Sequence, residues 1–224
     1  IRGFSVGASS MAINGVYGLA PEQNTPTEIF ERVEVLKGPG AMMMGMPPAG
    51  DVGGAINLVP KRAGKAPLTR MTTTYSSQSN LGVHADMARR FGEDQRLGVR
   101  VNGVVSGGET WLDRQTKARE IGHLALDYQG DGWNIEADAY SLKNKVRKGS
   151  PMQPILTGWT TVPKAPDGST NFFYGEGVYS NTQTQGLIVR GQARLSAGWT
   201  AFASAGKAQH AYDGFIFGTR PVWA

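Results

Sequence analysis

The chain has 224 residues, a net charge of +5 and no cysteine. Its length allows one or two domains with a hydrophobic core. The 23 basic residues are interleaved with 18 acidic residues rather than gathered in a stripe, which disfavours a nucleic-acid-binding protein. No apolar run approaches the roughly 18 residues of a membrane helix, so a helical membrane protein is disfavoured too.

The first segment, residues 1–62, is rich in glycine and proline. Two compact apolar runs, residues 32–36 and 55–59, are bounded by turn residues and predict short buried strands. Residues 27–30 predict a short helical turn, with Thr27 as its cap. The segment is therefore expected to be small and of mixed α and β structure.

Four ordered motifs in this segment resemble the plug domain of TonB-dependent outer-membrane receptors. The most specific is residues 31–39, followed after a short loop by residues 53–59 and by the pair Lys61 and Arg62. In the same order as the family's motifs, the four read IRGF, INGVYG, ERVEVLKGP and GGAINLV. The first two are similar to segments of ferric-siderophore receptors in particular.

Beyond Arg62 the chain alternates between apolar and polar residues with the period of a strand. In residues 96–106, for example, Val99 and Val101 fall on one face and Arg100 and Asn102 on the other. Several runs reach about ten residues, longer than typical globular strands and suited to a tilted membrane strand. Similar alternation covers residues 83–90, 124–128, 133–139 and 187–195.

The connections between these runs are of two kinds. Those near residues 93 and 130 are tight turns, whereas the interval from about 146 to 182 is long and carries prolines, glycines and aromatic residues. Short turns on one side and long loops on the other are typical of an outer-membrane barrel. A mean hydropathy of −0.30 is compatible with such alternating strands.

The resemblance implies a mainly β fold: part of a plugged antiparallel transmembrane β-barrel. Residues 1–62 would be the C-terminal part of a plug, and residues 63–224 the first six to eight up-and-down strands of the barrel. A plugged barrel of this family has about 22 strands. We therefore expect the chain to be a fragment of a longer protein, lacking the TonB box and the remaining strands.

A dense group of charges in the third motif suggests a plug–barrel charge lock, formed by Glu31, Arg32, Glu34 and Lys37. In a barrel lumen these side chains would pair with inward-facing charges, namely Arg100, Asp127, Glu136, Asp138 or Arg190. A solvated surface is the alternative for such a run. Three plug glycines, Gly38, Gly53 and Gly54, are expected to serve backbone geometry, because they allow turns and close approach to the barrel wall.

The family also suggests where a ligand would bind. A ferric siderophore already occupies every coordination position of the iron. Its receptor therefore needs aromatic walls and hydrogen-bond donors instead of metal ligands. No cofactor is expected, and no enzyme motif such as HExxH or a phosphate-binding P-loop supports catalysis. The ligand-binding candidates are Arg2, Tyr17 and Gln23 in the plug and Met152, Gln153, Trp159, Phe172, Phe173 and Tyr174 in the long loop.

The function implied is import of a ferric siderophore across the outer membrane of a Gram-negative bacterium. The expected partners are the chelate, TonB with its inner-membrane energising complex, and outer-membrane lipid, and the receptor is expected to be a monomer. The same receptor class with another cargo, such as haem, cobalamin or an oligosaccharide, remains an alternative. A passive porin-like barrel and a soluble β-rich binding module are weaker alternatives, since neither makes use of a plug.

Overall fold

The protein is described by a computed structural model that covers residues 1, 3, 7–38, 45, 53–149, 155–156, 164–172, 175–215 and 221–222. Its regular structure is almost entirely strand, which confirms the mainly β fold. One short 3-10 turn, η1 (Ala8–Ser10), precedes the first strand. None of the helical segments in the described ranges is long and apolar enough to cross a membrane.

Four strands near the N-terminus form a small mixed sheet, called here the plug sheet, in the order β2-β1-β4-β3. Strand β1 runs parallel to β4, while β3 is antiparallel to β4. The predicted strands at 32–36 and 55–59 lie inside β3 and β4, but only the second is largely buried; residues 32–35 are exposed because β3 is an edge strand of the plug sheet. The predicted helical turn at 27–30 is a single hydrogen-bonded turn, in which Phe30 N donates to Thr27 O at 3.2 Å. The strands are β1 (Met11–Ile13), β2 (Val16–Tyr17), β3 (Phe30–Lys37) and β4 (Gly54–Pro60).

Glycine geometry closes the β3–β4 pair. Gly38 has a φ of +94° and donates its N–H to Gly53 O at 3.1 Å. Gly54 has a φ of +136°, and a Cβ there would lie 2.0 Å from the backbone oxygen of Leu36. The close approach at Gly54 is thus to the neighbouring plug strand. For Gly38 and Gly53, close approach to the barrel wall stays a prediction.

Replacing Gly54 with alanine should destabilise the plug sheet by at least about 2 kcal/mol, because strained backbone and a backbone clash add together. Urea unfolding of the full-length protein would measure the change. Gly64→Ala is the matched control, since no atom lies within 4 Å of its added Cβ. An equal stability for the two variants would contradict the geometric role of Gly54.

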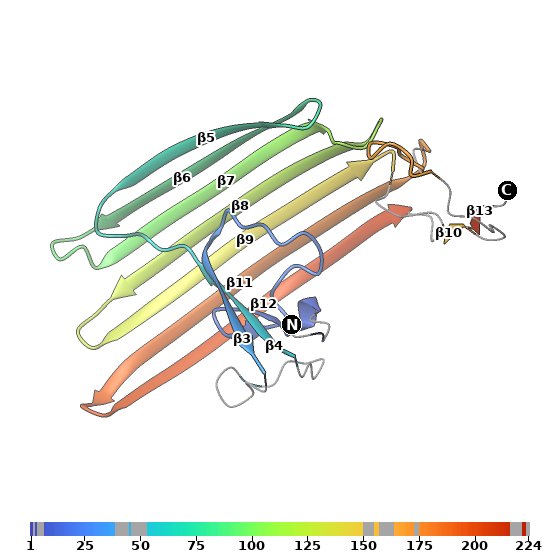
Figure 1. Ribbon diagram of the computed structural model, residues 1–224. Helices are drawn as coiled ribbons and strands as arrows, with labels where there is room; N and C mark the ends of the chain where they lie inside the picture. Colours follow the sequence, from blue (N-terminus) through green and yellow to red (C-terminus); the bar gives the residue numbers. More distant parts are fainter. Residues whose placement is uncertain are drawn as a thin grey trace.

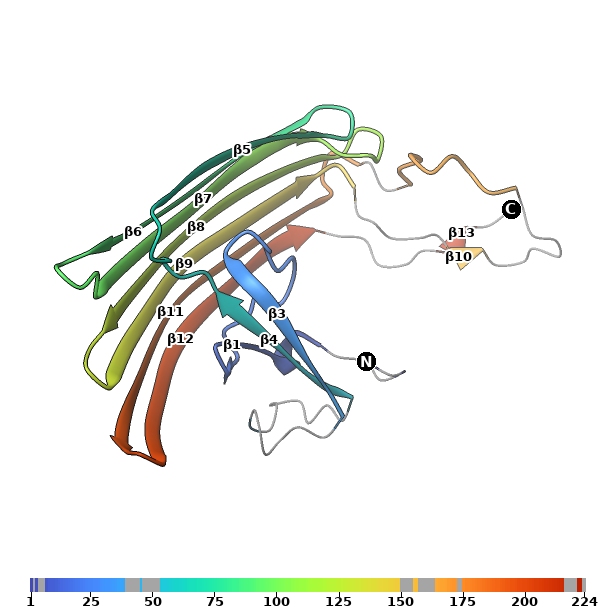
Figure 2. The ribbon, with the colours of Figure 1, turned by 60° about the vertical axis from the view of Figure 1, so that its left-hand side comes forward.

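Seven long strands form a second sheet, the wall sheet, in the order β12-β11-β9-β8-β7-β6-β5. Every neighbouring pair is antiparallel, and the strands of this sheet lie side by side in the order in which they follow along the chain. The sheet is strongly curved and remains open between β5 and β12 (Figures 1 and 2). The strands are β5 (Leu68–Ser76), β6 (Asn80–Phe91), β7 (Leu97–Glu109), β8 (Thr116–Gln129), β9 (Trp133–Arg147), β11 (Tyr179–Ser196) and β12 (Trp199–Phe215).

The two ends of the wall sheet differ. Tight turns at residues 92–96, 130–132 and 197–198 lie together at one end, called the turn end. Connections at residues 77–79 and 110–115, together with the end of β9 and the start of β11, lie at the other, the loop end (Figure 1). Beyond the loop end, β10 (Ile155–Leu156) pairs in parallel with β13 (Pro221–Val222).

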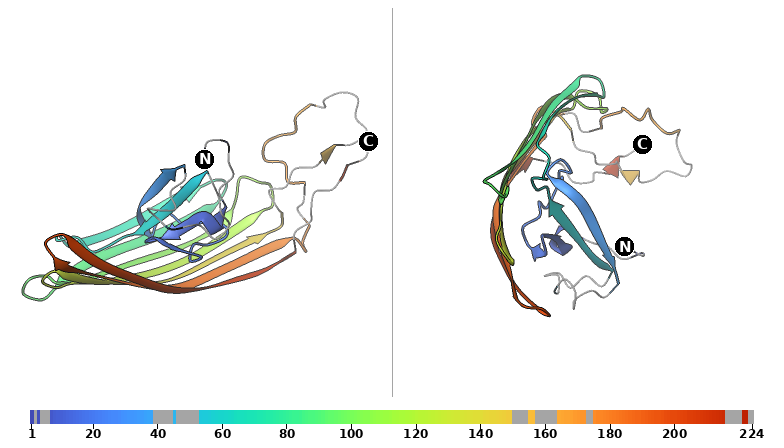
Figure 3. Two further views of the ribbon diagram at one scale, coloured as in Figure 1. Left: turned by 90° about the horizontal axis from the view of Figure 1, so that it is seen from below. Right: turned by 90° about the vertical axis from the view of Figure 1, so that its left-hand side faces the viewer.

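The wall sheet buries its polar face and exposes its apolar face. On the concave face Asp86, Asn102 and Asp138 are at most 2% exposed, whereas on the convex face Val101 is 43% and Val105 66% exposed. The plug sheet lies inside the concave face of the wall sheet (Figure 3). A sheet with this sidedness matches an apolar environment on its convex side.

An apolar cluster also joins the two sheets. Burying each such side chain stabilises the structure by roughly 1.5–3 kcal/mol. The plug-sheet side contributes residues from β1, β3, β4 and the segment between β2 and β3, and the wall contributes residues from β7, β8, β9 and β11. The buried members are Ile13, Leu19, Ala20, Ile29, Phe30, Leu58, Val104, Ile121, Tyr140, Leu142 and Ile188.

Candidate functional site at the junction of the two sheets

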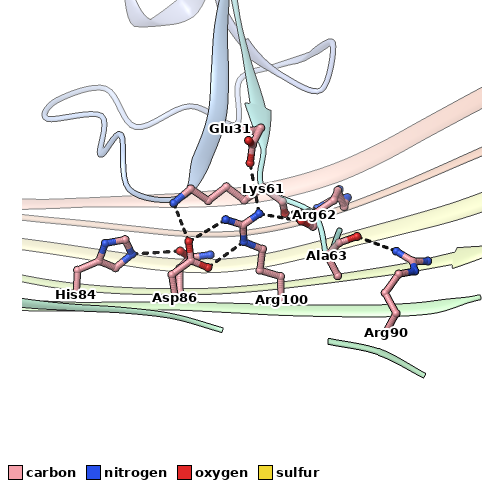
Figure 4. Close-up of polar contacts among 9 residues, drawn as sticks. Glu31, Lys61, Arg62, Ala63, His84, Asp86, Arg90 and Arg100 are labelled. Atoms are coloured by element: carbon pink, nitrogen blue, oxygen red, sulfur yellow. Dashed lines mark hydrogen bonds and ion pairs between the residues drawn. The ribbon is translucent and has the colours of Figure 1, made fainter. Parts of the chain in front are cut away.

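The segment that leaves β4 crosses onto the concave face of the wall sheet before β5 begins. Lys61 N donates to Ile29 O at 3.0 Å, which fixes the start of this segment to the plug sheet. From there Lys61, Arg62 and Ala63 reach the wall strands through side chains and backbone (Figure 4). We call these contacts the junction.

Asp86 on β6 is the centre of the junction. The residue is fully buried, and its carboxylate accepts from Lys61 Nζ at 3.0 Å and from Arg100 Nε and Nη2 at 2.9 and 2.8 Å. Arg100 also contacts Glu31 of β3, with 3.3 Å between Nη1 and Oε2. A buried charge with paired, charge-assisted hydrogen bonds of this kind depends strongly on each partner.

Arg62 makes the second group of charge contacts. Both terminal nitrogens of its guanidinium donate hydrogen bonds to the Asp138 carboxylate, and Nη2 lies 3.4 Å from Glu136 Oε2. His123 Nε2 lies 3.0 Å from Asp138 Oδ1 on the other side. Burial alone lowers the pKa of the Arg62 guanidinium, but the hydrogen bonds and charges of Asp138 and Glu136 raise it above its ordinary value. The side chain is therefore a permanent cation.

Two wall arginines bind the backbone of the connecting segment. Arg100 Nη1 donates to Arg62 O at 2.8 Å, and Arg90 Nη1 donates to Ala63 O at 2.9 Å. Arg90 is itself held by Asp127, with 2.7 Å between Nη2 and Oδ2. These contacts fasten the main chain between the two sheets at consecutive carbonyls.

Two further contacts join the sheets away from the connecting segment. Arg119 Nη2 donates to Glu28 Oε1 at 2.9 Å, and Tyr140 Oη donates to Leu19 O at 2.5 Å. The plug sheet is thus held at several separate points across the concave face. The contact set is mostly polar and charged, although an apolar cluster lies beside it.

Of the four residues predicted to form the charge lock, the structure brings Glu31 into contact with a wall residue. Arg32 and Glu34 are largely exposed and pair with each other, with 2.7 Å between Nε and Oε1. Glu34 also accepts from Asn57 Nδ2 at 2.8 Å. In the described residues Lys37 has no ion pair. The lock therefore stays a prediction for Arg32, Glu34 and Lys37.

A cleft of about 560 Å³ lies beside the junction and places the predicted lock residues opposite several of their predicted partners. The predicted partners Asp127 and Asp138 are occupied by Arg90 and Arg62. Sequence reasoning missed Lys61 and Arg62 as lock residues, although both close the plug signature directly after a strand. The charged or amide residues lining the cleft are Asn14, Glu31, Arg32, Glu34, Asn57, Arg62, Arg100, Glu136 and Arg190.

The predicted ligand-binding residues are only partly described. Tyr17 is half-buried on β2, with its hydroxyl 3.5 Å from Gly45 O, and burial raises its pKa. Gln23 is exposed in the plug, and Phe172 is 48% exposed at the loop end. No contact joins these three in the described part of the chain. Arg2, Met152, Gln153, Trp159, Phe173 and Tyr174 lie outside the described residues.

A second cavity, of about 420 Å³, opens at the loop end of the concave face. Trp111, Lys117 and Arg119 line it from the wall, and Glu28 lines it from the plug side. Sequence reasoning missed this site. The sequence signal for this cavity was the alternation of β8, which places Lys117 and Arg119 on the same inward-facing side of the strand.

Comparison with known proteins agrees with these observations. A family model described as the TonB-dependent receptor plug domain matches residues 1–55. The ferrichrome receptor FcuA of Yersinia enterocolitica is 35% identical over 216 residues, which cover 96% of this chain and 28% of that protein. The chain therefore spans less than a third of the length of this relative.

Solved structures show the same fold. The chain superposes on BauA, the ferric preacinetobactin receptor from Acinetobacter baumannii, with a TM-score of 0.86 and 37% identity over 95% of this chain and 31% of that one. The ferripyoverdine receptor of the Pseudomonas aeruginosa outer membrane has a TM-score of 0.78 at 17% identity, over 99% of this chain and 30% of that chain. The latter likeness concerns the fold alone. With a plug-domain match at its start and relatives of this identity along nearly its whole length, the chain matches part of a TonB-dependent receptor in both sequence and fold.

Proposed function

We propose that the chain is part of a receptor that binds a ferric siderophore at the outer face of the outer membrane and imports it in a TonB-dependent manner. The supporting observation is the junction, where Lys61, Arg62 and Glu31 meet charged wall residues. Ion pairs hold the plug sheet in place and yet can exchange with water when the plug moves. A plug that never left the barrel would be held better by an apolar interface than by ion pairs.

The arrangement of the sheets supports an assignment of the domains. Residues 1–62 would be the C-terminal part of the plug and residues 63–224 the first strands of the barrel. The loop end would face the outside and the turn end the periplasm, since long loops are external in such barrels. The convex face would contact lipid in the outer membrane of a Gram-negative bacterium, and the receptor would act as a monomer energised by the inner-membrane proton gradient.

The test is uptake of radioactive iron by cells that produce the complete receptor containing this chain. Hydroxamate, catecholate and carboxylate chelates would be supplied in turn to cells with and without TonB. TonB-dependent uptake of one class is the expected result. Absence of uptake for every chelate, with the receptor present at the cell surface, would refute iron import and favour haem, cobalamin or an oligosaccharide as cargo. Uptake without TonB would instead favour a passive porin.

The lipid-facing role of the convex face predicts a further result. Val101→Arg should reduce the stability of the membrane-inserted receptor by about 2–4 kcal/mol, because an arginine would face the apolar part of the bilayer. Gln183→Arg, on the same face but beside Lys143, should change it by only about 0–1 kcal/mol, as expected near the interface. Denaturant unfolding in lipid vesicles would measure both, and equal effects would contradict the lipid assignment.

A further inference from the structure

The cavity at the loop end lies on the side of the plug away from the turn end and is built from the first four wall strands. Its inner wall comes from β5 to β8, its rim from residues 110–115, and Glu28 of the plug closes it on one side. At about 420 Å³ it lies within the usual size range of small-ligand sites. A cavity in this place is open to a ligand that approaches the plug from the loop end.

The charges of the cavity do not balance. Arg119 is neutralised by Glu28 at 2.9 Å. Lys117, two residues earlier on the same face of β8, also lines the cavity, and no carboxylate of the described residues lies within ion-pair distance of it. Two cations thus face one acid. A partly buried ammonium without an acid partner favours the entry of an anionic group.

Trp111 is presented to the cavity by a short and well-bonded turn. Thr110 N donates to Gln115 O at 2.9 Å, and the two side chains bond at 2.7 Å between Oγ1 and Oε1. Both residues are buried, while Trp111 between them is 59% exposed. Asn171 Nδ2 holds the same turn by donating to Asp113 O at 2.8 Å. The backbone that carries the exposed indole is therefore fixed by hydrogen bonds, and the exposed ring offers a surface on which a flat ring can stack.

Small hydroxyl side chains and a glycine line the cavity together with Asn80, His84 and two valines. A Cβ at Gly82 would lie 2.6 Å from Thr74 Oγ1 and 3.1 Å from Ser106 Cβ, so glycine keeps the floor open. Hydroxyl groups can donate to an anionic oxygen from several directions. Those lining the cavity belong to Thr72, Thr74, Ser76, Ser77 and Ser106, and to Thr110, whose hydroxyl already donates to Gln115 Oε1.

From these features we infer that the loop-end cavity binds one arm of a negatively charged ferric chelate. The arm would be anionic and would carry an aromatic ring or a carboxylate. Lys117 supplies the charge partner, Trp111 the stacking surface and the hydroxyl groups additional donors. The inference rests on the proposed function and narrows its substrate class. Ferric complexes of catecholates are anions with flat rings, whereas ferric trishydroxamates are neutral and lack such rings. The cavity is suited to the first kind.

The test compares two probes on the purified complete receptor. Ferric tris(2,3-dihydroxybenzoate) is the anionic probe and a ferric trishydroxamate the neutral one, with retained radioactive iron as the readout. Lys117→Gln should weaken binding of the anionic probe by about tenfold to a hundredfold, as expected for a charge-assisted contact. Binding of the neutral probe should change by less than about twofold, which is below the loss expected even for one neutral hydrogen bond.

Two variants control for indirect effects. Lys117→Arg keeps the positive charge and should retain most of the affinity for the anionic probe. Lys143→Gln removes a lysine from the convex face of the adjacent strand and should leave both affinities unchanged. Equal losses for both probes with Lys117→Gln, or no loss for either, would overturn the anion site while leaving chelate binding intact. If neither chelate bound to the unaltered receptor, the proposed function would fail together with this inference.

Discussion

Replacing Asp86 with asparagine in the complete receptor should lower the free energy of plug unfolding by about 3–5 kcal/mol. The substitution removes the carboxylate between Lys61 and Arg100, so two cations would remain close together in a buried position. Urea titration in detergent would measure the change. A cysteine introduced at the exposed Glu22, in a receptor with any cysteine outside this chain replaced by serine, would carry a fluorescent label that reports on the plug.

Asp94→Asn is the matched control for this experiment. Asp94 pairs with Arg96 at 3.1 Å, but its side chain is 69% exposed in a turn of the wall sheet. An exposed pair of this kind contributes at most about 1 kcal/mol. A similar small effect for Asp86→Asn would mean that the buried carboxylate is not the centre of the junction.

Replacing Arg62 with alanine should increase leakage through the receptor. The variant leaves Asp138 and Glu136 without their guanidinium partner, and a buried acid that loses its partner costs about 3 kcal/mol or more. A weakening of that size raises the population of displaced plugs by about a hundredfold. Sensitivity of cells to a large hydrophilic antibiotic that the unaltered outer membrane excludes would measure the leak.

Arg32→Ala provides the comparison for Arg62→Ala. Arg32 also belongs to the plug, but its side chain is 62% exposed and its one described ion pair is with Glu34 on the same strand. We expect it to leave antibiotic sensitivity unchanged. Equal leakage from both variants would show that any loss of plug charge loosens the plug, and would contradict a specific role for the connecting segment.

Much of the fold was predictable because strand periodicity is local. Alternation through residues 96–106 correctly separates Val101 from Arg100, and the same rule places Asp86 and Asp138 on the polar faces of their strands, which the structure shows to be buried. Periodicity does not say which face is buried, since in a soluble sheet the apolar face would be inside. The resemblance to the plug family supplied that orientation.

The junction was predicted less completely, for a geometric reason. Charge density drew attention to Glu31, Arg32 and Glu34 on β3, an edge strand of the plug sheet whose central residues are exposed. Contact with the wall instead forms where β3 begins and where β4 has ended. Sequence alone does not reveal which end of a strand meets a partner sheet, so Lys61 and Arg62 were not chosen.

The main-chain contacts of Arg90 and Arg100 bear on how this family diversifies. Both side chains recognise carbonyl oxygens, at Ala63 and Arg62, and a carbonyl is present whatever residue occupies those positions. These two hydrogen bonds are therefore independent of the side chains at positions 62 and 63, unlike the ion pairs of Lys61 and Arg62. Domain exchange between relatives would preserve the two main-chain contacts, so a plug adapted to a new cargo would need only its charged contacts matched to this wall.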